Sequence, residues 1–398
     1  MTLDLWAEKG VPLDKQAFSW RELVGKPYSK LDVDAFTRVR VILMNGIESE
    51  QVRFLHMAAR MNAELREPLA IVRRSEQHQQ TMVNWLNPAD QSPLETTLAY
   101  EQVAIEVTAH IAQKEPDPYL AQVHRFGLLE DFDHLYRYAA LYERLEGGDP
   151  NNITQSYTDI VPGRPTEVEH RHPLDDLRRP YDRRTAQPLS KLHVYTLVAG
   201  EHQTHDYYMH VGPSFSDPVA RQLYAEIASI EEQHVTQYES LLPAEETWME
   251  KWLLHEACEV YNYWSCYGQE THPRIKQIWE RLLQYELGHL DYVRRLFERV
   301  ERRDASELLP RQLTEPIRYE AHRKFVRETL ERELQLRASG ADFVPAANEP
   351  ERSRAYRAQM NREGSPSETV AAGYFWRPGG ELASRALEMA QSRERRVQ

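Results

Sequence analysis

Apolar residues recur at intervals of three and four along eight stretches of the chain, with little of the apolar and polar alternation that strands require. This spacing is typical of amphipathic helices. Prolines fall between the stretches, as at Pro88, Pro243 and Pro273. The predicted helices span residues 36–63, 68–86, 94–113, 119–146, 190–210, 217–242, 248–266 and 273–302. The pattern predicts an all-α fold.

The helices form two sets that resemble each other at an offset of 155 residues. At this offset Glu76 matches Glu231, and Leu141-Tyr-Glu-Arg144 matches Leu296-Phe-Glu-Arg299. The sequence therefore predicts a tandem duplication of one four-helix bundle. The predicted parts are an N-terminal extension (1–34), a first bundle (35–147), a linker (148–189), a second bundle (190–302) and a helical extension with a tail (303–398). In the last part we expect a helix near 314–338, and Tyr374-Phe-Trp376 could latch onto a bundle or a partner.

Glutamate and histidine follow one spacing twice in the second set of helices. Glu201 precedes the pair Glu231 and His234 by 30 residues, and Glu256 precedes the pair Glu286 and His289 by the same number. Residues three apart share a helix face, and a span of 30 residues can rise along one helix and return along the next to the same height. All six side chains could then meet at one level of a bundle core. Carboxylates with imidazoles suit iron or manganese, whereas zinc more often takes thiolates or three histidines.

This ligand set resembles that of the ferritin-like di-iron or di-manganese carboxylate superfamily, in which two helices each give a Glu and two others each give Glu-x-x-His. The resemblance covers residues 190–302 closely, with a degenerate copy before them. It implies two iron ions, or alternatively manganese. The implied roles are terminal carboxylates for Glu201 and Glu256, bridging carboxylates for Glu231 and Glu286, and imidazole ligands for His234 and His289.

One feature departs from the family pattern. Family members join their second and third helices by a long crossover that makes those helices parallel, but Glu231 and Glu256 are only 25 residues apart. Either residues 243–251 run extended as a crossover, or the bundle is a simple up-down-up-down arrangement.

The first copy of the repeat retains only part of the ligand set. Glu76, Glu101, Asp131 and His134 remain, whereas the position of Glu201 falls on Gly46, or on Ile47 if the register slips, and that of His234 on Gln79. This copy could hold one metal ion, with Glu48 or Glu50 helping, or it could be a metal-free bundle kept for packing. We favour the metal-free, structural role.

A dinuclear carboxylate centre activates dioxygen or peroxide. The leading hypothesis is therefore a metal-dependent oxidoreductase that oxidises a small substrate, with a possible electron donor. One alternative is a peroxide- or iron-handling protein, either catalase-like or a ferroxidase. Another is a non-enzymatic scaffold stapled by metal. His205, Tyr238 and Tyr285 are candidates for tuning the site, although each could be an ordinary core aromatic or surface imidazole.

The composition argues against several other classes of protein. The net charge of −13 argues against nucleic-acid binding, which needs a basic face. The sequence has no apolar run of membrane-spanning length, and its first residues lack a signal pattern, so we expect a cytoplasmic protein without a membrane span. A homodimer is compatible with the sequence. Cys258 and Cys266, eight residues apart on one predicted helix, are interpreted as buried apolar residues.

Overall fold

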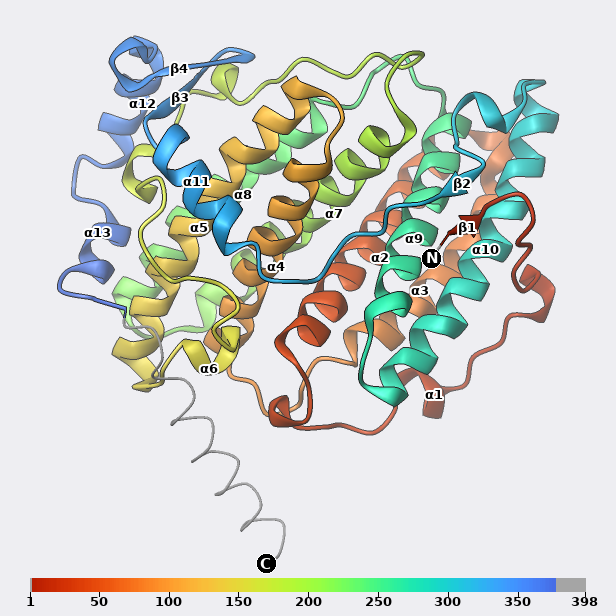
Figure 1. The fold of residues 1–398 in the computed structure, drawn as a ribbon, viewed down its shortest axis with the longest axis horizontal. Coiled ribbons are helices and arrows are strands. Elements are labelled where there is room, and N and C mark those ends of the chain that lie inside the picture. Colours follow the sequence, from red (N-terminus) through yellow and green to blue (C-terminus); the bar gives the residue numbers. More distant parts are fainter. Residues whose placement is uncertain (1, 377–398) are drawn as a thin grey trace, which may run out of the picture.

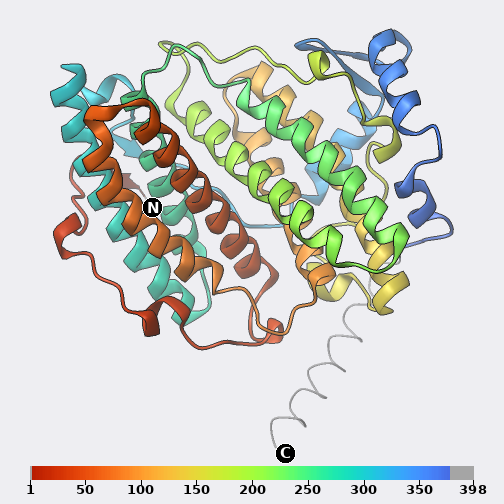
Figure 2. The same cartoon turned by 180° about the vertical axis from the view of Figure 1, so that it is seen from behind.

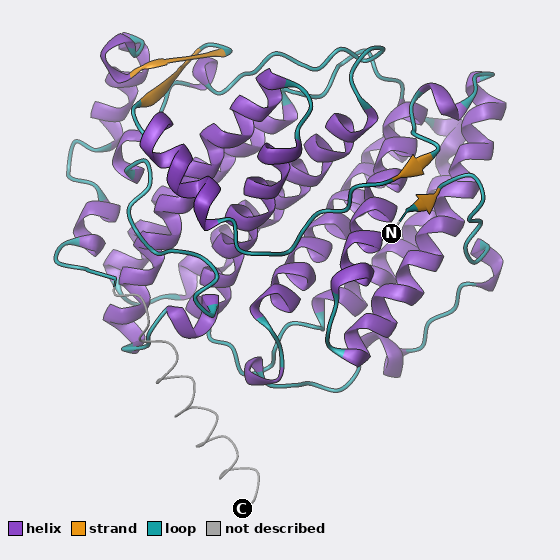
Figure 3. Ribbon diagram, viewed as in Figure 1, coloured by secondary structure: helices purple, strands orange, loops and turns teal. Residues whose placement is uncertain are grey.

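The computed structural model describes residues 2–376, and most of them are helical (Figure 3). The predicted helical fold is confirmed, with two short two-stranded sheets added to it. The eight long helices are α2 (Ala35–Met61), α3 (Arg66–Asn84), α4 (Pro93–Lys114), α5 (Pro118–Glu146), α7 (Pro188–Val211), α8 (Pro218–Glu239), α9 (Trp248–Gln269) and α10 (Pro273–Glu301).

The helix starts follow from local sequence. Proline occupies the first turn of α4, α5, α7, α8 and α10, where its missing N–H group is not needed. Ser92 with Glu95 forms a capping box at the start of α4, and Thr247 with Glu250 forms the same box at the start of α9. Matched caps therefore begin matched helices of the two repeats.

The long helices pack into two groups, and each group combines one hairpin from each repeat (Figures 1 and 2). We call α2, α3, α9 and α10 bundle I, and α4, α5, α7 and α8 bundle II. Bundle II is one continuous stretch, residues 93–239, inserted between the two halves of bundle I. The predicted division into bundles at 35–147 and 190–302 is therefore wrong. The repeats have exchanged equivalent hairpins, which leaves every local sequence pattern unchanged.

The helix directions in bundle II follow from contacts at both ends. The Tyr207 hydroxyl donates to the Pro93 carbonyl oxygen at 3.0 Å, and His193 lies 2.8 Å from Glu115, so α4 and α7 are antiparallel. Helices α4 and α5 form a hairpin, so α5 and α7 run parallel. The chain between them, residues 147–187, is a long crossover that includes α6 (Asn151–Thr154).

Bundle I has the same arrangement with a different connection. Arg40 donates to Glu270 at 2.9 Å and Gln51 to Glu256 at 2.7 Å, so α2 and α9 are antiparallel. The short segment between α8 and α9 links bundle II to bundle I. It is therefore neither the crossover nor the hairpin turn that we expected around residues 243–251.

The region after α10 differs from the predicted helix at 314–338. β2 (Gln312–Leu313) pairs with β1 (Leu3–Asp4), an extended stretch follows, and α11 covers only Arg323–Glu333. The extended stretch buries the alternate residues Ile317 and Tyr319, a two-residue period that our helical interpretation overlooked. β3 (Leu336–Ser339) and β4 (Asp342–Pro345) then form an antiparallel hairpin.

The predicted polar tail contains two further helices, α12 (Glu351–Met360) and α13 (Pro366–Ala371), and α13 packs against α5 and α8. The Tyr136 hydroxyl donates to the Tyr374 carbonyl oxygen at 3.0 Å, and Trp376 Nε1 donates to Asn151 at 2.8 Å. The expected latch thus attaches to bundle II. The rest of the predicted tail, residues 377–398, lies outside the described residues.

At the other end of the chain, α1 (Trp20–Val24) contacts α3. Within residues 2–376, no helix combines the length and the apolar character needed to cross a membrane. Cys258 and Cys266 are unpaired and buried, as predicted.

Candidate metal centres

The six predicted ligands do not meet at one site. Glu201, Glu231 and His234 lie in bundle II, whereas Glu256, Glu286 and His289 lie in bundle I. The prediction that all six converge is wrong because the second repeat contributes one hairpin to each bundle. Each group of three instead lies close to carboxylate or histidine residues of the first repeat.

Bundle II contains four carboxylate residues and two histidines, the residue types expected for the two-metal site. We call this group cluster II. Its members are Glu101 from α4, Asp131 and His134 from α5, Glu201 from α7, and Glu231 and His234 from α8. All six are buried, and none exceeds 3% exposure. They form two overlapping groups, Asp131–Glu201–Glu231–His234 and Glu101–His134–Glu231, and the ligand atoms within each group lie within 4.8 Å of one another. Glu231 belongs to both groups.

Both histidines of cluster II point Nδ1 inward. Nδ1 of His234 lies 3.2 Å from Asp131 and 3.3 Å from Glu231, and Nδ1 of His134 lies 3.1 Å from Glu231. On the outer side, Nε2 of His234 donates to Glu130 at 2.7 Å and Nε2 of His134 donates to Glu169 at 2.8 Å. A carboxylate acceptor keeps a proton on Nε2, so each ring can offer Nδ1 to a metal ion.

The carboxylates of cluster II differ in the direction of their pKa shifts. Burial raises the pKa values of Glu101, Asp131 and Glu201 above their ordinary range. Burial also opposes ionisation of Glu231, but hydrogen bonds with His134 and His234 outweigh it and lower the pKa of Glu231 to about 2. For the same two imidazoles, burial favours the neutral form, yet the surrounding carboxylates raise both pKa values. Metal binding would therefore release protons from these histidines.

Several carboxylate oxygens in cluster II are buried without a hydrogen-bond donor among the described residues. They are both oxygens of Asp131, Oε2 of Glu101 and Oε2 of Glu201. Buried oxygens without partners are unfavourable unless a cation or a proton satisfies them. The unsatisfied oxygens and the mixed carboxylate and imidazole donors together fit divalent transition-metal ions.

Bundle I contains a related group, cluster I. Its members are Glu48 from α2, Glu76 and Gln79 from α3, Glu256 and Glu259 from α9, and Glu286 and His289 from α10. Nδ1 of His289 lies 2.8 Å from Glu76, and its Nε2 donates to Gln16 Oε1 at 2.8 Å. The ring thus has the same orientation as the two histidines of cluster II.

The helix bounds correct the predicted correspondence between the repeats. Helices α4 and α9, like α5 and α10, are offset by 155 residues at both ends, but α2 begins at Ala35 and α7 at Pro188, an offset of 153. At this offset Glu48 matches Glu201, and Gly46 matches Ala199. The prediction that Gly46 or Ile47 replaces Glu201 is therefore wrong, because the repeats differ by two residues before α3.

The three candidate tuning residues have different surroundings. His205 is half-buried, and its nearest ionic partner is Asp206 at 3.5 Å. The Tyr285 hydroxyl donates to the Ala17 carbonyl oxygen at 3.2 Å, in the N-terminal segment. Neither residue is placed in a cluster, so both of these predictions are corrected. Tyr238 is buried beside cluster II, where burial and the charges of Glu201 and Asp131 raise its pKa.

Sequence reasoning missed several residues that contact the clusters. Tyr208, two turns after Glu201, donates to Glu101, and Tyr263 donates to Glu48. Glu169 lies in the crossover, where no spacing rule relates it to His134. Glu130, which receives the His234 hydrogen bond, is held by Arg171 at 2.8 Å. Burial opposes its ionisation, but the charges of Arg171 and Arg164 and the hydrogen bond from His234 together outweigh burial, so the pKa of Glu130 lies below its usual range.

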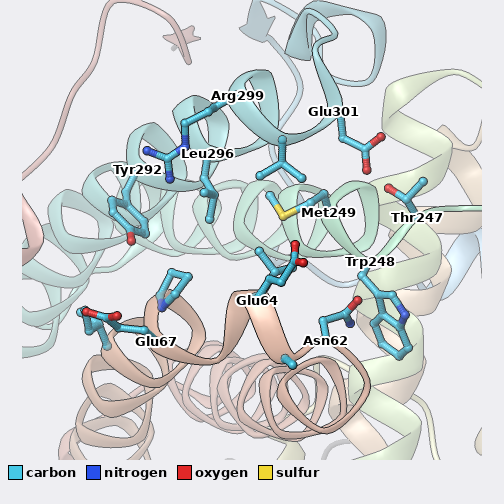
Figure 4. Close-up of a pocket in the computed structure, with 15 residues that line it drawn as sticks. Asn62, Glu64, Glu67, Thr247, Trp248, Met249, Tyr292, Leu296, Arg299 and Glu301 are labelled. Carbon is cyan, nitrogen blue, oxygen red and sulfur yellow. The ribbon is translucent and has the colours of Figure 1, made fainter.

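A pocket of about 740 Å³ opens at the end of bundle I, where α2 and α10 end and α9 begins (Figure 4). Asn62, Glu67, Trp248, Tyr292 and Arg299 are among the residues that line it. Its lining residues include no member of either cluster.

Comparison of the chain with protein-family models, with curated proteins and with solved structures finds no match.

Proposed function

We propose that bundle II is a ferritin-like bundle whose cluster II holds a dinuclear iron centre, with manganese as the alternative metal. The protein would be a metal-dependent oxidoreductase that uses dioxygen or peroxide to oxidise a small substrate. The observation that carries this proposal is the pair of overlapping ligand groups that share Glu231 in a buried core.

The topology of bundle II supports the ferritin-like assignment. Its second and third helices, α5 and α7, are parallel and joined by the long crossover at 147–187, which is the connection that the family pattern requires. The short spacing between Glu231 and Glu256 no longer conflicts with the family pattern, because those two residues belong to different bundles.

The ligand roles follow from the two groups. Glu231 would bridge both ions. Asp131 belongs to one group only, but its match in the repeat, Glu286, belongs to both groups of cluster I, so Asp131 would be the second bridge. Glu201 with His234 would complete one ion, and Glu101 with His134 the other. Two such ions, when bound, share the electrons needed to activate dioxygen or peroxide.

Tyrosine side chains next to cluster II provide hydrogen-bond donors. The Tyr208 hydroxyl donates to Glu101 and fixes one terminal carboxylate. The Tyr238 hydroxyl is buried and has no hydrogen-bond partner among residues 2–376, and its raised pKa keeps it protonated, so it is available as a hydrogen-bond donor beside cluster II. The complete burial of the six ligands limits the access of bulk water.

The same burial favours a second candidate function. No member of cluster II lines the pocket of Figure 4, and a small reactant reaches a buried site more readily than a large one. Peroxide handling or ferroxidase chemistry needs only such small reactants.

The substitution Glu231→Ala tests the metal assignment. Because Glu231 belongs to both ligand groups, its loss should remove both ions of cluster II, whereas Glu232→Ala, an exposed neighbour on the same helix, should remove none. Metal content after iron loading, measured by inductively coupled plasma mass spectrometry, gives the answer. A folded Glu231→Ala protein that binds as many ions as the wild type would refute the bridging role.

Reactivity separates an oxidoreductase from a metal-stapled scaffold. The iron-loaded protein should consume dioxygen or peroxide and change its optical spectrum, and Glu231→Ala should do neither. A wild-type protein that binds two ions in cluster II and consumes neither oxidant would be a scaffold, contrary to the proposal.

A further inference from the structure

We propose that cluster I is a second metal centre with a different ligand class from cluster II. One of its positions, formed by Glu48, Glu76, Glu259 and Glu286, offers oxygen ligands only and would take a hard divalent cation such as Mn²⁺. This proposal does not rest on the chemistry proposed for cluster II.

The two clusters differ by an exchange of one nitrogen ligand for one oxygen ligand. Gln79 stands where cluster II has His234, and Glu259 stands where bundle II has Ala104. A carboxylate oxygen of Glu259 lies within 4.8 Å of ligand oxygens of Glu48, Glu76 and Glu286. At this candidate metal position, cluster I therefore lacks the imidazole of cluster II and has one more carboxylate.

Gln79 has a different task from the histidine that it replaces. Its amide nitrogen donates to Glu76 Oε2 at 3.1 Å and also to Glu286. It therefore orients the two carboxylates that match the bridging pair of cluster II. Glu259 is left as the additional ligand.

Glu259 is the strongest indication of a bound cation. It is 1% exposed, and neither of its oxygens has a hydrogen-bond partner in the described part of the chain. A neutral carboxyl group would need an acceptor for its proton, and a carboxylate would need donors or a cation. Residues 2–376 place neither an acceptor nor a donor within hydrogen-bond geometry of Glu259, so a cation satisfies it best.

Charge balance leads to the same conclusion. The five carboxylates of cluster I, those of Glu48, Glu76, Glu256, Glu259 and Glu286, are all buried. Glu76, Glu256 and Glu286 share a single imidazole, that of His289, as their ion-pair partner. One imidazolium cannot balance five carboxylates in a core where unpaired charge is strongly unfavourable. Two divalent cations would balance four of them.

The second position of cluster I keeps a nitrogen ligand. Glu76, Glu256, Glu286 and His289 place their ligand atoms within 4.8 Å of one another, and the Gln16 contact fixes the His289 ring. This position matches Glu231, Glu101, Asp131 and His134 of cluster II. Cluster I thus combines one position like those of cluster II with one all-carboxylate position.

Manganese titration of the full-length, metal-free protein tests the proposal. Electron paramagnetic resonance of free Mn²⁺ gives the number of ions bound. Glu259→Ala and Glu259→Gln should each bind about one Mn²⁺ fewer than the wild type, and the half-exposed control Glu298→Ala should bind the same number. Circular dichroism checks that each variant is folded. A folded Glu259→Gln protein that binds Mn²⁺ with unchanged number and affinity would overturn the proposal.

Two further variants separate the clusters. Glu231→Ala should lose the ions of cluster II and keep those of cluster I, so failure of one assignment is distinguishable from failure of the other. Gln79→His restores an imidazole to the all-oxygen position and should shift its preference from Mn²⁺ towards Zn²⁺ in competition titrations. An unchanged Mn²⁺ to Zn²⁺ affinity ratio in this variant would count against the all-carboxylate position.

Discussion

At the scale of single residues, each histidine of the two clusters is held between inner carboxylates and one outer acceptor. The outer acceptors are Glu130 for His234, Glu169 for His134 and Gln16 for His289. The three contacts come from a helix, the crossover and the N-terminal segment, so segments outside the eight helices also position the candidate ligands.

Loss of an outer acceptor should weaken metal binding without removing a ligand. Glu169→Gln cannot hold the Nε2 proton of His134 as a carboxylate does, and affinity at cluster II should fall about 10- to 100-fold. Glu167→Gln, two residues away and half-buried, should change little. Competition with a chelator of known affinity measures the difference. Equal affinities in the two variants would mean that Glu169 does not support the ligand.

Sequence alone could find the candidate ligands whose spacing repeats within and between helices. Glu231 and His234 lie three residues apart on one helix, and each is placed in a cluster. Glu169 was not found because it lies in the crossover and reaches His134 only in the folded chain. Tyr208 was not found because its partner, Glu101, lies on a neighbouring helix. Glu259 falls outside the repeated spacing, because its match in the first copy is Ala104, yet the structure places it with Glu256 in cluster I.

At the scale of elements, the contact between α2 and α7 joins the two bundles. A side chain at Gly46 would place its Cβ 2.7 Å from the Gln203 side chain and 2.9 Å from the Ala199 carbonyl oxygen. Asn45 Nδ2 donates to Gln203 at 3.0 Å in the same contact. The missing side chain at position 46 lets these helices approach closely.

Gly46→Ala should therefore destabilise the protein by about 1–3 kcal/mol, because the backbone oxygen of Ala199 cannot move alone. Gly200→Ala is the matched control, since a Cβ there meets nothing within 4 Å. It should stabilise the helix by up to about 1 kcal/mol. Urea unfolding followed by circular dichroism measures both changes. A Gly46→Ala protein as stable as Gly200→Ala would show that the helices can separate freely.

The predicted helices were mostly correct where caps and prolines mark their ends. The helix expected at 314–338 failed because Ile317 and Tyr319 are buried as alternate residues of an extended chain. A short period-two segment next to a true helix looks like part of that helix when only apolar spacing is considered.

At the scale of the whole molecule, the two repeats have exchanged equivalent helical hairpins, so each bundle contains two helices from each repeat. Local sequence could not show this, because an exchanged hairpin has the same pattern as the hairpin it replaces. Connection length was the available signal. The long segment at 147–187 is the crossover of bundle II, and the short segment after α8 leads into bundle I.

The most direct test of the account is the position of bound metal in crystals of the iron- or manganese-loaded protein, located by anomalous diffraction at the metal absorption edge. We predict two peaks in bundle II, one among Asp131, Glu201, Glu231 and His234 and one among Glu101, His134 and Glu231. A loaded crystal with no anomalous peak at these residues would contradict the account.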